Sequence, residues 1–291
     1  MPPRAPRARR AKLPEGTPAL IARALAEDRV GSDITTQALF PRAVRVRARV
    51  VAQSRGVVSG LAAAAELGRM TGVEVRPLVR DGSAVRARQP VLALAGDLRT
   101  ILGIERTLLN LVMHLSGVAT ATRAAVRRSR GAGAPQVYGT RKTIPGLRAL
   151  EKAAIVHGGG QPHRADLADA VLVKNNHLAF VGIPEAVERL RHRLGRRPIQ
   201  VEVRTAREAV AAVKAGAEAI LIDNAGPGQA RAIVGAARSA PGGRRVWIEL
   251  SGGITPSSIA RYRRSGADAA SLGSITHSAP ALPFHLVVRR R

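Results

Sequence analysis

The sequence predicts an α/β protein whose second half is a parallel sheet covered by helices and whose first half is a smaller domain. Of its 291 residues, 45% are apolar but only 2% are aromatic, so that Ala, Val, Leu and Gly dominate. Such small residues let helices pack closely against a parallel sheet. In addition, strand and helix patterns alternate after Gly133, whereas the region before it lacks this regular alternation.

Short apolar runs in the second half are expected to be strands. They occupy residues 136–139, 170–173, 199–203, 219–222, 246–250 and 269–272. Helical patterns fill the intervals, at residues 147–157, 184–194, 206–215, 228–239 and 257–265. Repeated strand–helix units imply parallel strands joined by right-handed crossovers. This pattern leaves open whether the sheet forms a barrel or an open doubly wound sheet.

The first half mixes the two periodicities. Helices are expected at 17–29, 59–72 and 100–130, the last of them as one helix or as two that separate near Ser116 and Gly117. Arg alternates with Val or Ala over residues 43–53, which is typical of a half-exposed strand, and short strands should follow within 73–94. We therefore expect a disordered basic tail at 1–14, an N-terminal domain at 15–116, the parallel-sheet domain at 117–280 and a C-terminal tail at 281–291.

The composition excludes several classes of protein. Because the chain has no cysteine, it can form neither disulfides nor thiolate metal sites, which suits a cytoplasmic protein. The longest stretch without Asp, Glu, Lys or Arg runs from Thr107 to Thr122. This is shorter than the roughly 20 apolar residues that a membrane-spanning helix needs. We expect a soluble, cytoplasmic protein without a membrane partner.

Basic residues greatly outnumber acidic ones, 47 to 20, and the formal net charge is +27. Such a charge can indicate nucleic-acid binding, a solvated basic surface with basic tails, or attraction of a polyanionic substrate. Nucleic acid is the least favoured main partner, because proteins that bind single strands usually stack bases on aromatic side chains. Only five of the basic residues are Lys, which makes Lys142 and Lys174 candidates for a specific role.

Polar or glycine residues lie at the ends of nearly every predicted strand of the second half. They are Arg141, Lys142, Lys174, Glu202, Asp223, Ser251 and Gly273. Barrel enzymes place their chemistry at the carboxyl ends of the strands, so these positions favour a barrel with one shared site. Glu202 and Asp223 would suit ribose hydroxyls or a Mg²⁺ ion.

Glycines next to two of these strand ends suggest a phosphate site. Ser251, Gly252 and Gly253 follow one strand, and Gly273 with Ser274 follows the last one. Exposed backbone N–H groups at such turns bind anions. The glycines at 158–160 follow a helix instead, so we interpret them as a helix end and a connector. His163 and Arg164, which come next, are candidate anion ligands.

Ordered motifs along the chain resemble those of the quinolinate phosphoribosyltransferase family, also called carboxylating nicotinate-nucleotide pyrophosphorylase. In the second half they are residues 140–143, 145–152, 158–160, 163–164, 174–177, 202–204, 221–224, 251–254 and 276–278. In the first half they are residues 32–36, 58–60 and 105–110. The resemblance extends from about residue 20 to residue 280.

The resemblance implies a C-terminal open α/β-barrel with a smaller N-terminal α/β sandwich domain. It implies that quinolinate reacts with phosphoribosyl pyrophosphate, with Mg²⁺ as the cofactor, to give nicotinate mononucleotide, pyrophosphate and CO₂. It also implies a homodimer in which the N-terminal domain of one subunit covers the barrel mouth of the other.

The resemblance also assigns roles to individual residues. The two carboxylates of quinolinate would be held by Arg141, His163, Arg164 and, across the subunit boundary, Arg106. Lys142 and Lys174 would lie by the pyrophosphate or the reacting ring, and Glu202 and Asp223 by ribose hydroxyls and metal-bound water. The 5′-phosphate would be held by Ser251, Gly252, Gly253 and Gly273, with His277 nearby. No residue would bind Mg²⁺ directly, because the ion would be held mainly through substrate phosphates and water.

Three positions depart from the family pattern. Asn175 stands where Asp is usual, Leu250 where Ala or Ser is common, and Pro283 where an acid is usual. Two alternatives therefore stand beside the main prediction: a phosphoribosyltransferase that acts on another aromatic acid, and a basic binding protein that kept the fold but lost catalysis. Lys174 and His177 argue against a related branch associated with molybdenum transport.

Overall fold

The computed structural model describes residues 13–241 and 246–289. The chain forms two compact units, and both consist of segments that are separated in the sequence. The N-terminal unit comprises Met1–Gly117, Ala149–His157 and Ala281–Arg291, and the C-terminal unit comprises Val118–Arg148 and Gly158–Pro280. Residues 1–12 of the predicted basic tail lie outside the described part of the chain.

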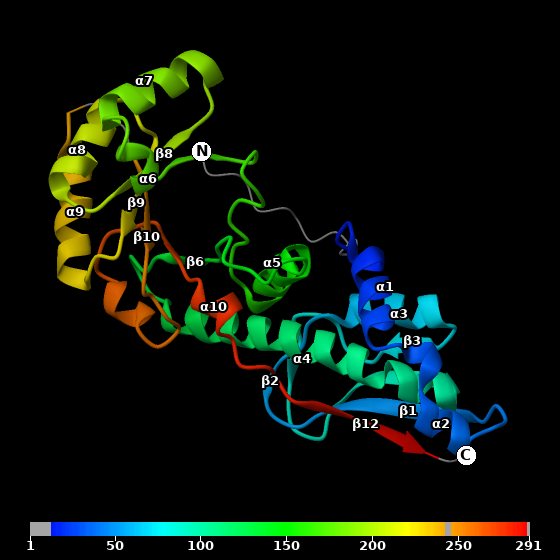
Figure 1. Ribbon diagram of the computed structural model, residues 1–291. Coiled ribbons are helices and arrows are strands. Elements are labelled where there is room, and N and C mark those ends of the chain that lie inside the picture. Colours follow the sequence, from blue (N-terminus) through cyan, green and yellow to red (C-terminus); the bar gives the residue numbers. More distant parts are fainter. Residues whose placement is uncertain (1–12, 242–245, 290–291) are drawn as a thin grey trace. The chain divides into compact units, whose positions relative to one another are not determined.

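Six parallel strands form the sheet of the C-terminal unit (Figure 1). They are β6 (Gln136–Tyr138), β7 (Val171–Val173), β8 (Ile199–Val203), β9 (Ala219–Asp223), β10 (Trp247–Ser251) and β11 (Ala269–Ser271). Their order is β6-β11-β10-β9-β8-β7, so that the first two strands in sequence lie at opposite edges. A closed barrel would pair these two strands, and among the described residues they are not paired. The predicted open α/β-barrel is confirmed.

Four of the five predicted helices of the second half are also present. They are α5 (Arg148–Gly158), α7 (Ile183–Leu194), α8 (Ala206–Lys214) and α9 (Pro227–Ser239), and the short helices α6 (Asn175–Leu178) and α10 (Ser274–His277) were not expected. Figure 1 shows α7, α8 and α9 side by side along the outer side of the strands. Ala209 and Ala212 of α8 and Ala230 of α9 are fully buried, which agrees with the prediction that small residues let helices and strands pack closely.

The helix predicted at 257–265 is wrong in type and length. Only a 3₁₀ helix, η2 (Ile259–Tyr262), forms there. Upstream of it, Thr255 Oγ1 accepts a hydrogen bond from the backbone N–H of Ser258 at 3.2 Å and contacts the hydroxyl of Ser257 at 2.8 Å. Ser and Thr hydroxyls that bond locally in this way compete with a regular helix.

An antiparallel sheet forms the centre of the N-terminal unit, in the order β12-β1-β5-β3. The strands are β1 (Arg45–Ala52), β3 (Glu74–Pro77), β5 (Pro90–Asp97) and β12 (Phe284–Arg289). A second sheet consists of β2 (Gly56–Val57) and β4 (Ala84–Val85), and the shorter helical elements are α1 (Thr17–Glu27), η1 (Val30–Ser32), α2 (Ile34–Leu39) and α3 (Leu61–Thr71). Strand β12 was not expected, because residues 281–291 were interpreted only as a tail. Its Phe284 pairs with Ala52, far away in the sequence.

Helix α4 (Leu98–Arg128) is continuous, so the alternative of two helices separated near Ser116 and Gly117 is wrong. The reason lies in the contacts of Ser116. Its fully buried hydroxyl accepts a hydrogen bond from the backbone N–H of Ser59 at 2.9 Å and donates one to the Ser59 carbonyl at 3.2 Å. A serine that looks like a helix breaker in the sequence thus anchors α4 to the loop before α3.

One face of the antiparallel sheet is rich in arginine. The side chains of Arg45, Arg47 and Arg49 alternate with buried residues along β1 and are exposed. Arg289 of the edge strand β12 lies directly opposite Arg47. Among the described residues, no helix is both long enough and apolar enough to cross a membrane.

Candidate active site at the carboxyl ends of the barrel strands

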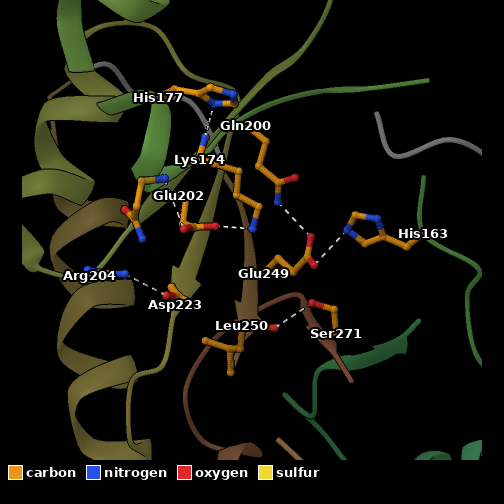
Figure 2. A network of polar contacts seen from close by, with 11 residues as sticks. His163, Lys174, His177, Gln200, Glu202, Arg204, Asp223, Glu249, Leu250 and Ser271 are labelled. Atoms are coloured by element: carbon orange, nitrogen blue, oxygen red, sulfur yellow. Dashed lines mark hydrogen bonds and ion pairs between the residues drawn. The ribbon is translucent and has the colours of Figure 1, made fainter. Parts of the chain in front are cut away.

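Charged side chains gather at the carboxyl ends of three neighbouring strands, β7, β8 and β9 (Figure 2). Lys174 follows β7, Glu202 is the last but one residue of β8, and Asp223 ends β9. The predicted strand ends therefore meet at one edge of the sheet, as parallel pairing requires.

The ammonium group of Lys174 forms an ion pair with the carboxylate of Glu202. Glu202 is only 5% exposed, and its other oxygen accepts a hydrogen bond from the backbone N–H of Asn175 at 3.3 Å. The backbone N–H of Lys174 donates a hydrogen bond to Nδ1 of His177 at 2.8 Å. These contacts fix the start of α6 against the end of β8, and they leave the Lys174 side chain 43% exposed.

Asp223 is the second carboxylate of the site. Its side chain is 17% exposed, and Arg204, which is largely exposed, approaches it at 3.6 Å. Because this contact is long and solvent-accessible, it is weak and leaves the carboxylate available for other partners. Among the described residues, no group of three or more His, Asp or Glu side chains could hold a metal ion.

A cationic cavity of about 690 Å³ adjoins this pair within the C-terminal unit. Its charged or titratable lining residues are Arg141, Arg164, Lys174, His177 and Arg197, and no Asp or Glu lines it. Burial, and then repulsion by Arg141, lowers the pKa of Arg164 below its ordinary value. The buried Nε atom of Arg141 has no hydrogen-bond partner in the described part of the chain. Such a concentration of positive charge with a spare donor suits an anionic ligand.

His163 and Arg164 stand next to this cavity, but their contacts differ. The backbone of His163 has a φ of 58°, and its Nε2 lies 3.1 Å from a carboxylate oxygen of Glu249. Its Nδ1 accepts a hydrogen bond from the backbone N–H of Arg164 at 2.8 Å. Both ring nitrogens are therefore engaged within the chain, whereas the Arg164 side chain lines the cavity.

Sequence reasoning missed Glu249 and Gln200. Glu249 lies inside β10 and is 4% exposed, and its other oxygen accepts a hydrogen bond from Nε2 of Gln200 at 2.9 Å (Figure 2). Burial alone would raise the pKa of Glu249, but hydrogen bonds with His163, Ser271 and Gln200 outweigh it and hold the pKa below its ordinary value. The available signal was an acidic residue within an otherwise apolar strand pattern.

The glycines predicted to bind phosphate have the geometry of tight turns. Gly252 and Gly253 follow β10 with φ values of 88° and 63°. A Cβ atom on Gly252 would lie 2.1 Å from Oδ1 of Asn224, so the backbone approaches that side chain too closely for any other residue. The backbone carbonyl of Ser251 accepts a hydrogen bond from the backbone N–H of Asn224 at 2.9 Å, and this bond joins the ends of β9 and β10.

Gly273 brings Lys142 and His277 into the same turn. A Cβ atom on Gly273 would lie 2.9 Å from Nε2 of His277 and 3.0 Å from Cδ of Lys142. The carbonyl of Lys142 accepts a hydrogen bond from the hydroxyl of Thr276 at 2.7 Å. The segment after β6 is thereby joined to the segment after β11.

Arg106 is the one predicted site residue that belongs to the N-terminal unit, where it is exposed on α4. All the other predicted site residues belong to the C-terminal unit. Most of them form two groups there, one around Lys174 and the cationic cavity and the other around Gly273.

Comparisons with known proteins agree with this architecture. Residues 33–116 match the family model of the quinolinate phosphoribosyl transferase N-terminal domain, and residues 118–287 match that of its C-terminal domain. A probable carboxylating nicotinate-nucleotide pyrophosphorylase of Methanothermobacter thermautotrophicus is 39% identical over 260 residues, which cover 88% of this chain and 93% of that protein. The corresponding Mycobacterium leprae protein is 39% identical over 272 residues, which cover 91% of this chain and 95% of the relative.

Solved structures give the same result. A nicotinate-nucleotide pyrophosphorylase from Francisella tularensis superimposes with a TM-score of 0.88 at 32% identity, covering 96% of this chain and 98% of that one. One from Ehrlichia chaffeensis has a TM-score of 0.88 at 28% identity, covering 96% and 100%.

Proposed function

The chain belongs to the quinolinate phosphoribosyl transferase family, and from this premise we propose that it makes nicotinate mononucleotide for NAD biosynthesis. It would transfer the phosphoribosyl group of phosphoribosyl pyrophosphate to quinolinate, with release of pyrophosphate and CO₂. The observation that carries this proposal is the cationic cavity at the carboxyl ends of the strands, which has arginine and lysine but no carboxylate in its lining.

Quinolinate, a dicarboxylate, matches this cavity in charge. Arg141 and Arg164 would each offer a planar pair of N–H donors to a carboxylate, which is the geometry that arginine provides best. Lys174 would reach the same space from its pair with Glu202, because an ammonium group has three donors and this pair uses one. His163 would act beside them, although both of its ring nitrogens are already engaged within the chain.

The sugar phosphate would occupy the other part of the site. Backbone N–H groups at Ser251, Gly252, Gly253 and Gly273 would hold the 5′-phosphate. Lys142 and His277 lie close to Gly273. Glu202 and Asp223 would face the ribose hydroxyls. Their negative charges would stabilise the cationic sugar that develops in the transition state.

Catalysis would then depend on positioning and charge. The ring nitrogen of quinolinate forms a bond to C1′ as the bond between C1′ and the pyrophosphate oxygen breaks, and pyrophosphate leaves with that electron pair. The pyridinium nitrogen next draws electrons from the adjacent 2-carboxylate. The bond between the 2-carboxylate and the ring carbon breaks, and CO₂ leaves. The carbanion that remains on this carbon is stabilised by the neighbouring positive charge until it takes up a proton.

The residues present fit a Mg²⁺ ion that arrives with the substrate. This ion keeps several waters and typically binds through one or two carboxylates and substrate phosphates. Glu202 and the partly exposed Asp223 would be the carboxylates nearest to it, acting through water. Bound Mg²⁺ would neutralise charge on the departing pyrophosphate.

We propose further that Arg106 acts across a homodimer. Its place in the N-terminal unit, separate from the other predicted residues, supports this arrangement. An inactive Arg106→Ala protein mixed with an inactive Lys174→Ala protein should regain roughly a quarter of the activity, because random exchange forms half of the dimers as hybrids with one intact site. Absence of recovery despite subunit exchange, verified with differently tagged subunits, would contradict a shared site.

The activity itself is tested directly. The purified protein is incubated with quinolinate, phosphoribosyl pyrophosphate and Mg²⁺, and nicotinate mononucleotide and CO₂ are followed by mass spectrometry. Nicotinate serves as the control acid, because it lacks the 2-carboxylate that leaves. Product from quinolinate alone is expected. If a folded protein forms no product, the proposed activity is wrong, and Asn175→Asp becomes the first variant to assay.

A further inference from the structure

Glu249 is a buried acid to which the proposed mechanism gives no task. It lies on β10, and both it and Glu202 of β8 have Leu221 of β9 as a register partner, so the two carboxylates extend from the same level of the sheet. Glu202 pairs with the partly exposed Lys174, whereas Glu249 is bonded to His163 and Gln200 (Figure 2). A buried carboxylate is unfavourable unless its partners compensate for lost hydration, so this arrangement needs an explanation.

The hydrogen bonds around His163 determine which ring nitrogen carries the proton. Nδ1 accepts a hydrogen bond from the backbone N–H of Arg164 at 2.8 Å, so Nδ1 is the unprotonated ring nitrogen. The proton therefore resides on Nε2, which donates to Glu249 at 3.1 Å. The ring is also held edge-to-face against Tyr138, with ring centroids 6.3 Å apart. In this state neither ring nitrogen has a proton to offer a substrate carboxylate.

The hydrogen bonds of the His163 ring maintain an unusual backbone conformation at His163. Its φ of 58° lies in the left-handed region, which is unfavourable for a residue with a Cβ atom. Such a conformation persists only where surrounding contacts over-determine it. Here the turn aims the next residue, Arg164, at the cationic cavity, where its guanidinium also binds the carbonyl of Ala170 at 3.1 Å.

We infer that Glu249 is a positioning residue. It fixes the His163 ring, and the ring in turn fixes the backbone of Arg164, so that the Arg164 side chain faces the aromatic acid. We call this chain of contacts from Glu249 through His163 to Arg164 the brace. In this arrangement His163 supports the binding site through the backbone of Arg164 and does not itself bind the acid. This inference deepens the proposed function and rests on it for the identity of the acid. It alters the role that family resemblance gives to His163.

The first test compares two variants of Glu249. Glu249→Ala removes the acceptor for His163, and we expect the KM for quinolinate to rise roughly 10- to 100-fold, the range for loss of a hydrogen bond to a charged group. The KM for phosphoribosyl pyrophosphate should change less than about twofold, because the hydrogen-bond partners of Glu249 are His163, Gln200 and Ser271, and none of them belongs to the glycine turns. Glu249→Gln keeps an acceptor oxygen for His163, and it should stay within about threefold of the wild type.

A double-mutant cycle tests whether Glu249 acts through His163. If Glu249 acts only through His163, His163→Ala and the double variant should have the same KM for quinolinate within about twofold. If Glu249 acts independently of His163, the two single effects should multiply in the double variant. Equal increases in both KM values, multiplying effects, or an unchanged KM in Glu249→Ala would each overturn the inference.

A spectroscopic measurement keeps this test independent of the enzymatic activity. Nitrogen NMR of histidine rings, assigned by comparison with His163→Ala, should show His163 protonated at Nε2 and unprotonated at Nδ1 at neutral pH. Glu249→Ala should abolish this single tautomer, and Glu249→Gln should retain it. A protein with the expected tautomer but no product would refute the proposed activity and leave the brace intact, whereas mixed tautomers in an active wild-type enzyme would refute the brace.

Discussion

The turn after β10 illustrates how single residues set this site. Gly252 and Gly253 both have positive φ, but they differ in their surroundings. A Cβ atom on Gly252 would collide with Asn224, whereas nothing lies within 4 Å of the corresponding position on Gly253. The two glycines therefore form a matched pair in which one variant carries backbone strain alone and the other adds a collision.

We expect Gly253→Ala to lower the free energy of unfolding by about 1 kcal/mol, because an L-residue in the left-handed region costs about that much. Gly252→Ala should lower it by about 2 kcal/mol or more, since overpacking adds to the strain. The displaced turn should also raise the KM for phosphoribosyl pyrophosphate roughly tenfold. Urea denaturation and steady-state kinetics measure both effects, and equal behaviour of the two variants would contradict the predicted collision.

The lowered pKa of Glu249 predicts a pH dependence of stability. The carboxylate is favoured in the folded state, so its contribution is fully present above the ordinary pKa of 4.5 and is lost as the pH falls from there through the lower folded-state value. Below pH 4.5 the wild type should therefore lose stability more steeply than Glu249→Gln, which cannot ionise. Urea denaturation at a series of acidic pH values measures how the free energy of unfolding of each protein changes with pH. Equal pH dependence of the wild type and Glu249→Gln would contradict the lowered pKa of Glu249.

At the residue scale, the sequence indicates which polar side chains lie at strand ends, whereas their roles in the site stay predictions. Lys174, Glu202 and Asp223 were predicted from their positions at the ends of apolar runs, and these positions meet at one edge of the sheet. Glu249 was missed because it precedes the end of its strand by two residues. Only the three-dimensional arrangement, with His163 arriving from a distant loop, gives this acid a partner.

At the scale of elements, helix α4 depends on a contact that its own sequence does not reveal. Ser116→Ala would leave the buried N–H and carbonyl of Ser59 without their side-chain partner. We expect a loss of about 1–3 kcal/mol in the free energy of unfolding, the cost of unpaired buried polar groups. Ser59→Ala is the matched control, because it retains these backbone bonds and removes only the hydroxyl that contacts His157 at 2.8 Å. Thermal and urea denaturation would show whether the first variant is the less stable of the two.

Most elements could be predicted because their periodicity is local. The five strands from β7 to β11 and helices α7 to α9 follow the apolar pattern closely, since each buries its own regular face. Strand β12 could not be predicted, because its pairing with β1 joins residues more than two hundred positions apart. Local hydroxyl bonds likewise shortened the predicted helix at 257–265, which periodicity alone could not indicate.

At the scale of the whole molecule, the N-terminal unit is completed by the last segment of the chain. Truncation after Leu282 would remove β12 and leave the backbone groups of β1 from Arg47 to Ala52 without their partners. We expect a loss of several kcal/mol in stability, because each lost backbone hydrogen bond contributes about 0.5–1.5 kcal/mol and the buried Phe284 is removed as well. The melting temperature and the soluble yield measure this effect. A chain that stops after Arg289 is the control and should behave as the full-length protein.

The arginine-rich face of that same sheet has a consequence for how copies of the chain meet in solution. Strand β12 is an edge, and an edge offers free backbone groups to any other extended chain. Arg289 on this edge strand and Arg47 beside it on β1 give this part of the sheet a positive charge that an incoming identical strand would share. A second identical edge is therefore repelled before backbone bonds can form. This protection against fibrous self-association weakens as salt rises and the Debye length shrinks to about 3 Å at 1 M.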